Sequence, residues 1–207
     1  MIRLIMLLVA VSACMASGAR TAGEIFAQAP DRVLRLLPQS TRLDMLDYFR
    51  YGSDKTSANA LGGDARITSE SPADIRLQLS ERAEMQLCVL TAGRDTVVAV
   101  VETLMTPVPD SRIEFYSLPS WQTVKSPVKM PVRADWLTDE GRRHADELEA
   151  LLPFDFVEAR FDPDEGRLVL TNNARQYLTA DVFEHIEPWI RPQLSYTVSG
   201  TKIKADK

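Results

Sequence analysis

Residues 75–101 read IRLQLSERAEMQLCVLTAGRDTVVAVV, and this stretch decides the fold. Apolar residues alternate with polar ones at Ile75, Leu77 and Leu79 and again at Met85, Leu87 and Val89, the period of a half-buried β-strand. After a turn at Gly93, the run from Thr96 to Val101 is rich in β-branched residues and suits a central strand. The stretch therefore predicts antiparallel strands joined by short loops.

The same pattern extends on both sides of this stretch. A further strand begins at Ile113, which predicts a meander of about four strands, with a weaker strand signal from Ile67. Upstream, apolar residues at helical spacing predict short helices over 24–27, 31–37 and 41–49. None of these helices is long enough to be stable alone, so we expect them to pack on the sheet.

The C-terminal part predicts more helices and strands. Residues 142–152 form an amphipathic pattern, and the turn Asp162–Gly166 between 156–161 and 167–171 is typical of a β-hairpin. A helix over 179–190 and strands at 194–198 and Ile203 complete the chain. We therefore expect an α+β fold, in which an antiparallel sheet has helices packed on one face.

The domain organisation follows from the proline-rich segment 118–139, which interrupts every candidate element. We expect a single α+β domain over residues 20–204. This domain would contain two subdomains, 20–117 and 140–204, joined by the segment 118–139.

Composition excludes several classes of protein. The chain of 207 residues has 24 basic and 29 acidic side chains and a net charge of −5, which argues against a nucleic-acid binder. Two cysteines exclude a disulfide scaffold, and two histidines leave little for a histidine-rich metal site. We expect no cofactor and no bound metal.

The N-terminal residues 1–19 are interpreted as a signal peptide. Arg3 supplies a positive charge, Leu4 to Ala13 is apolar to small, and small residues follow up to Ala19. Cleavage after Ala19 would release a soluble periplasmic protein. In the alternative, the sequence before Cys14 resembles a bacterial lipobox, and a lipid on Cys14 would be the chain's one contact with the membrane.

A search for catalytic motifs yields two weak patterns. Ser126 and Lys129 spell Ser-x-x-Lys, but Pro131 would end the helix that this chemistry requires. His144, Glu147 and His185 lie on two predicted helices and would form a zinc site only if those helices met. We interpret both helices as having solvated charged faces, and we assign no catalytic or metal-binding residue.

The candidate binding residues are Trp121, Met130 and Trp136 in the segment 118–139. Two aromatic side chains and a methionine could form a recognition surface, or they could anchor the segment to the core. Cys88 lies in an apolar strand pattern and is interpreted as a core residue rather than a nucleophile.

Three stretches carry a resemblance to a known family. They are Arg42–Phe49, Leu77–Arg82, and Ile113–Tyr116 with Trp121 downstream. They resemble Domain of Unknown Function (DUF) family 3256, exported proteins of Gram-negative gut-type anaerobic bacteria. The resemblance runs from about Ala22 to about Ile203 and implies an exported protein without an assigned activity.

The sequence supports two hypotheses of function. In the first, the chain is a non-enzymatic envelope module that binds a protein, peptide or glycan partner, in the periplasm or at the outer membrane. In the second, it is an envelope hydrolase whose site is assembled from residues distant in sequence. A cleft with convergent histidine, aspartate or serine groups would favour the hydrolase.

Overall fold

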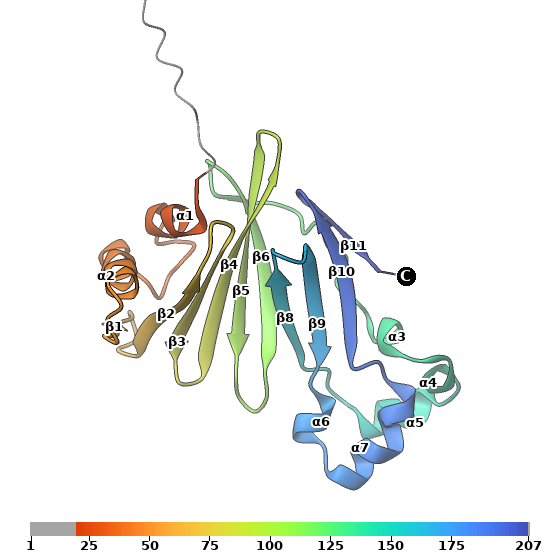
Figure 1. The fold of residues 1–207 in the computed structure, drawn as a ribbon. Coiled ribbons are helices and arrows are strands. Elements are labelled where there is room, and N and C mark those ends of the chain that lie inside the picture. Colours follow the sequence, from red (N-terminus) through yellow and green to blue (C-terminus); the bar gives the residue numbers. More distant parts are fainter. Residues whose placement is uncertain (1–19, 207) are drawn as a thin grey trace, which may run out of the picture.

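The computed structural model describes residues 20–206, so the predicted signal peptide and Cys14 lie outside the described residues. The chain forms two antiparallel sheets and several helices, which confirms the α+β class (Figure 1). The first sheet contains, in spatial order, β1 (Ser57–Ala58), β2 (Asp64–Glu70), β3 (Asp74–Ser80), β4 (Ala83–Ala92), β5 (Asp95–Leu104), β6 (Asp110–Ser117) and β7 (Gln122–Thr123). The second contains β8 (Val157–Asp162), β9 (Arg167–Asn172), β10 (Gln193–Ser199) and β11 (Lys202–Ala205), in the order β11-β10-β9-β8.

The stretch 75–101 forms the centre of the first sheet, as predicted. Strands β4 and β5 are each 10 residues long and pair in register from Ala83 with Leu104 to Ala92 with Asp95. The predicted strands match β3 to β6, whereas the two-residue strands β1 and β7 have no signal of their own in the sequence. They form because the chain passes along an existing sheet edge, not because of local propensity.

Alternation gives the first sheet two different faces. Odd residues of β4 such as Leu87 lie in a core shared with helices α1 (Ala22–Gln28) and α2 (Gln39–Arg50). Even residues such as Cys88 lie in a second core, shared with the second sheet. The helices α1 and α2 therefore cover one face, as predicted, and the second sheet covers part of the other (Figure 1).

The predicted helix over 31–37 is wrong, because this segment consists of turns. The guanidinium of Arg42, a side chain only 1% exposed, donates to the carbonyl oxygens of Ala29 and Leu37, which lie at the two ends of the segment. It also pairs with Asp31 at 3.0 Å. These contacts fix the connection between α1 and α2 in a non-helical path.

A third apolar cluster joins the small helices at one end of the molecule. These are α3 (Arg133–Trp136), α4 (Asp139–Arg143), α5 (Ala145–Leu151), α6 (Ala174–Tyr177), α7 (Ala180–Ile186) and the 3₁₀ turn Glu187–Trp189. The predicted helix over 142–152 is divided at His144 into α4 and α5. Buried Leu148 and Ile186 pack together with Trp189 at the centre of this cluster.

The segment 118–139 contacts all three apolar clusters. Trp121 packs in the core beneath α1 and α2, Val128 and Trp136 pack in the core between the sheets, and Leu137 packs in the helical cluster. The proline-rich chain is thus held along its length by buried side chains. None of the helices in the described part of the chain is long and apolar enough to cross a membrane.

Candidate functional site

The second sheet reaches the first through its edge strand β8, which contacts β4, β5 and β6. Alternate amides of β8 donate to side chains of the first sheet. The pairs are Val157 with Asp110 Oδ1 at 3.0 Å, Ala159 with Ser111 Oγ at 2.9 Å and Phe161 with Gln86 Oε1 at 2.9 Å. These side chains take the place of a neighbouring strand, so the edge of β8 is closed to pairing with another chain.

Gln86 on β4 makes the most complete of these contacts. Its Oε1 accepts from the Phe161 amide, and its Nε2 donates to the Phe161 carbonyl oxygen at 2.8 Å. The same Nε2 donates to Asp74 Oδ1 at 2.6 Å. Because Gln86 is buried, all of these bonds are shielded from water, and the side chain acts as a polar tie between the two sheets.

Asp74 and Arg76 on β3 extend the tie toward solvent. Asp74 is buried, and its Oδ2 lies 3.0 Å from Arg76 Nε, while Arg76 Nη2 donates to the Phe161 carbonyl oxygen at 3.2 Å. Burial raises the pKa of Asp74, and the hydrogen bond from Gln86 and the charge of Arg76 oppose this shift. The guanidinium of Arg76 is thereby held in a fixed position at the junction of the sheets.

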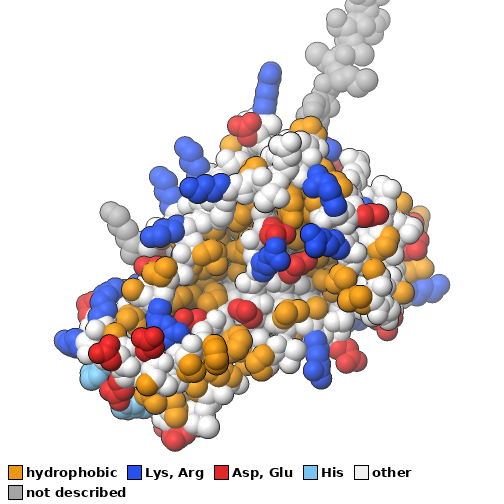
Figure 2. Space-filling view, turned by 180° about the vertical axis from the view of Figure 1, so that it is seen from behind, with side chains coloured by type: hydrophobic (Ala, Val, Ile, Leu, Met, Phe, Trp, Pro, Cys, Tyr) orange, Lys and Arg blue, Asp and Glu red, His pale blue; other side chains and the backbone are white. Residues whose placement is uncertain are grey.

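A polar cleft of about 300 Å³ opens beside this tie, between the outer face of β8 and the uncovered part of the first sheet. Its charged and polar lining includes Arg76, Glu84, Gln86, Thr103, Glu158 and Arg160. From behind, basic and acidic side chains lie side by side near the centre of the molecule (Figure 2). The cleft thus presents both signs of charge within a small volume.

Three of the charged lining side chains have no hydrogen-bond or ion-pair partner within the described residues. Among residues 20–206, Glu84, Glu158 and Arg160 take part in none of the ion pairs or side-chain hydrogen bonds. Thr103, by contrast, is bonded to Ser111 through their hydroxyl oxygens at 2.8 Å. Neither histidine of the chain lines the cleft. The arrangement suits the binding of a ligand that carries both an acidic and a basic group.

The residues that the sequence singled out for binding lie elsewhere. Trp121 is 7% exposed and packs against Tyr116, with ring centroids 6.2 Å apart, whereas Trp136 is 2% exposed in the core between the sheets. Met130 is 42% exposed. The structure brings the three side chains into different surroundings, and both indole rings serve to hold the segment 118–139 on the core.

Both histidines contact Glu147, although they lie far apart in the sequence. Glu147 Oε1 lies 3.0 Å from His185 Nε2, and its Oε2 lies 3.5 Å from His144 Nδ1. The ring of His144 stacks on Trp189 and that of His185 meets it edge-on. The bond to His185 lowers the pKa of Glu147. Within residues 20–206, no group of three His, Cys, Asp or Glu could hold a metal ion.

The Ser-x-x-Lys pattern lies on an irregular segment, not on a helix. The Ser126 hydroxyl donates to the Val128 carbonyl oxygen at 2.7 Å and accepts from the Val128 amide at 3.3 Å. Ser126 is therefore engaged in a local turn and not with Lys129.

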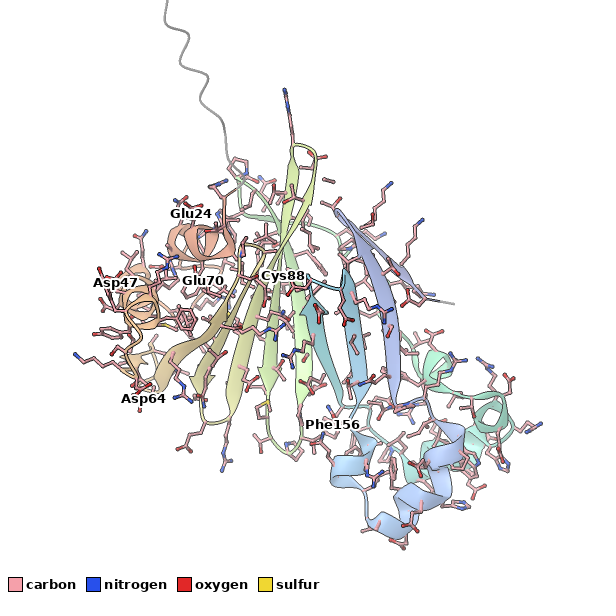
Figure 3. All side chains as sticks on the ribbon, viewed as in Figure 1. Glu24, Asp47, Asp64, Glu70, Cys88 and Phe156 are labelled. Carbon is pink, nitrogen blue, oxygen red and sulfur yellow. The ribbon has the colours of Figure 1, made fainter. Side chains whose placement is uncertain are left out.

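Cys88 lies in the interior beneath the second sheet (Figure 3). Burial raises the pKa of its thiol to about 12, and the nearby charge of Asp74 adds to the shift. Because the thiolate is the nucleophile, such a thiol is inert at neutral pH. This agrees with the sequence-based interpretation of Cys88 as a core residue.

We expect a disulfide reagent to modify native Cys88 about a thousandfold more slowly at pH 8 than an exposed thiol, because so little thiolate is present. The measurement uses dithionitrobenzoate on the Cys14→Ser variant, with and without denaturant. One thiol should react rapidly after unfolding. Rapid reaction in the native protein would contradict the burial of Cys88.

Residues 14–203 match the family described as Protein of unknown function (DUF3256). The chain belongs to this family. This membership confirms the resemblance seen in the helical stretch Arg42–Phe49 and in the strands around Leu77 and Phe115.

A solved structure has a similar fold. It is a domain of an uncharacterized protein from Porphyromonas gingivalis W83, with a TM-score of 0.75 and 20% sequence identity. The similarity covers 91% of this DUF3256 chain and 98% of the other chain. None of the curated proteins matches the sequence. The likeness establishes the architecture alone.

Proposed function

We propose that this DUF3256 protein is a non-enzymatic binding module of the cell envelope, which holds a charged peptide segment of its partner in the cleft beside β8. The observation that carries the proposal is that Glu84, Glu158 and Arg160, beside the fixed guanidinium of Arg76, have no hydrogen-bond or ion-pair partner within the described residues. Unpaired charges that line a cleft are available to a ligand without disruption of the fold.

The chemistry of the cleft favours a peptide among the protein, peptide and glycan partners considered from the sequence. A peptide can present a carboxylate to Arg160 and an ammonium group to Glu84 or Glu158 in one extended segment. Charge-assisted hydrogen bonds of this type are stronger than neutral ones and select the partner by its charge pattern. A neutral glycan would leave these charges without counterparts.

Export to the periplasm or outer membrane is part of the proposal and rests on residues 1–19 of the sequence. Mass spectrometry of protein purified from the native envelope distinguishes the two forms. An N-terminus at Arg20 would indicate a soluble periplasmic protein, and a lipid on Cys14 would indicate an anchored one. Full-length protein in the cytoplasm would contradict export.

The peptide proposal is tested by capture from a mixture of random hexapeptides on the immobilised protein, followed by mass spectrometry. We expect peptides with both an acidic and a basic residue to be enriched. In Arg160→Gln, retention of these peptides should fall about tenfold, because a charge-assisted hydrogen bond contributes roughly 1.5–3 kcal/mol.

The matched control is Arg94→Gln, at the tip of the β4–β5 turn and away from the cleft, which should retain the same peptides as the natural sequence. Equal retention by both variants, or no enrichment, would contradict the proposal. The same experiment also tests the hydrolase hypothesis, since cleaved peptides in the eluate would favour an enzyme.

A further inference from the structure

A second cavity, of about 310 Å³, lies between the end of β9 and helices α6 and α7. It differs from the charged cleft because side-chain amides dominate its polar lining, from Asn172, Asn173, Gln176 and Gln193. Its volume is at the small end of the range of about 300–1,000 Å³ that is typical of ligand pockets. The cavity would therefore take a small group or the end of a larger ligand.

Some of these amide groups form hydrogen bonds within the protein, and others have no partner in the described part of the chain. Asn173 Nδ2 donates to the Pro109 carbonyl oxygen at 2.6 Å, and its Oδ1 accepts from Gln176 Nε2 at 2.8 Å. Asn172 is 9% exposed, and its Oδ1 accepts from the Ala174 amide, but its buried Nδ2 has no hydrogen-bond partner. A buried donor without a partner costs free energy, so a ligand that reaches it would be favoured.

The charged groups of the cavity largely neutralise each other. Arg175 Nη1 lies 3.7 Å from Glu187 Oε1, and the Arg175 guanidinium also lies over the ring of Phe183, 5.4 Å from its centroid. Phe183, Ile190 and Pro192 supply the apolar part of the lining. A charged ligand would therefore meet no unpaired opposite charge among the described residues of this cavity.

We propose that this amide-lined cavity binds a neutral sugar residue. Each primary amide offers a donor and an acceptor side by side, which matches the hydroxyl and acetamido groups of sugars, since these also donate and accept. The aromatic and aliphatic side chains match the C–H face of a pyranose ring. The cavity is distinct from the peptide cleft, and the inference does not depend on the function proposed for that cleft.

The cavity and the cleft share the outer face of the second sheet. In the ladder, Glu158 of the cleft lies opposite Thr171, and Thr171 lies opposite Gln193 of the cavity. Gln193 Nε2 donates to Thr171 Oγ1 at 3.3 Å, so its carbonyl oxygen is left to accept from a ligand. Gln193 is exposed, so its substitution should disturb the fold little.

The test is saturation-transfer NMR on the full chain with glucose, galactose, N-acetylglucosamine and chitobiose as probes. We expect saturation transfer from the protein to at least one of them, with a dissociation constant of about 1 mM, the range of a small, weakly held ligand. Gln193→Leu should weaken this binding at least fivefold. Gln122→Leu on the distant strand β7 is the matched control and should leave it unchanged.

Two results would overturn the inference. One is the absence of saturation transfer to all four sugars in the natural protein. The other is equal sugar affinity in Gln193→Leu and in the natural protein, since the sugar would then bind elsewhere. Capture of charged peptides by Gln193→Leu should be unaffected, so a failure here is distinguishable from a failure of the peptide proposal.

Discussion

Replacement of Gln86 by leucine should lower the free energy of unfolding by about 2–4 kcal/mol, because buried groups on two elements lose their partners. The Phe161 amide loses its acceptor, and Asp74 Oδ1 loses its donor. The side chains are similar in size, so the effect comes from the hydrogen bonds and not from a cavity. Urea unfolding followed by tryptophan fluorescence and circular dichroism measures the change.

Gln78→Leu is the matched control for this prediction. Gln78 lies on the adjacent strand β3 opposite Glu84, and its Oε1 accepts from Arg66 Nε at 2.9 Å in an exposed pair. Its replacement should change stability by no more than about 0.5 kcal/mol, as is usual for surface residues. If Gln86→Leu were as mild as Gln78→Leu, Gln86 would not be the tie between the sheets.

Replacement of Arg42 by methionine should cost about 2–6 kcal/mol, because two buried carbonyl oxygens lose their donor at about 1–3 kcal/mol each. Methionine retains the apolar contacts of the side chain but leaves the carbonyl oxygens of Ala29 and Leu37 without a donor. Burial lowers the pKa of Arg42, and the nearby Asp31 opposes this shift. Thermal and urea unfolding of the full chain provide the measurement.

Asp31→Asn separates the ion pair from the carbonyl contacts of Arg42. The Asp31 side chain is 64% exposed, so we expect its loss to cost less than about 1 kcal/mol, as for exposed ion pairs. A cost in Asp31→Asn as large as that in Arg42→Met would show that the ion pair, and not the carbonyl contacts, fixes the connection between α1 and α2.

The strands could be predicted from the sequence because their signals are local. Alternation in residues 75–101 and the turn Asp162–Gly166 determine β3 to β5 and the hairpin of β8 and β9 without reference to the rest of the chain. The segment 31–37 has helical spacing, but Arg42 from the following helix binds the carbonyl groups at its ends. Tertiary contacts therefore overrode a local pattern.

The candidate sites could not be predicted in the same way. Arg76 alternates with apolar residues, which signals only a polar strand face, and its partner Phe161 lies 85 residues away. Gln86 and Phe161 are 75 residues apart, so their pairing depends on how the second sheet crosses the first. Trp121 and Trp136 stand out in the sequence as aromatic residues of a proline-rich segment. In the structure their side chains are buried and anchor this segment to the core.

Binding of a peptide in the cleft beside β8 can be observed residue by residue. Amide NMR spectra of the ¹⁵N-labelled full chain, titrated with the hexapeptides that the natural protein enriches, test it most directly. We expect chemical-shift changes at Arg76, Gln86 and Arg160, with loss of these changes in Arg160→Gln. Changes confined to residues outside the cleft, or changes that persist in Arg160→Gln, would contradict it.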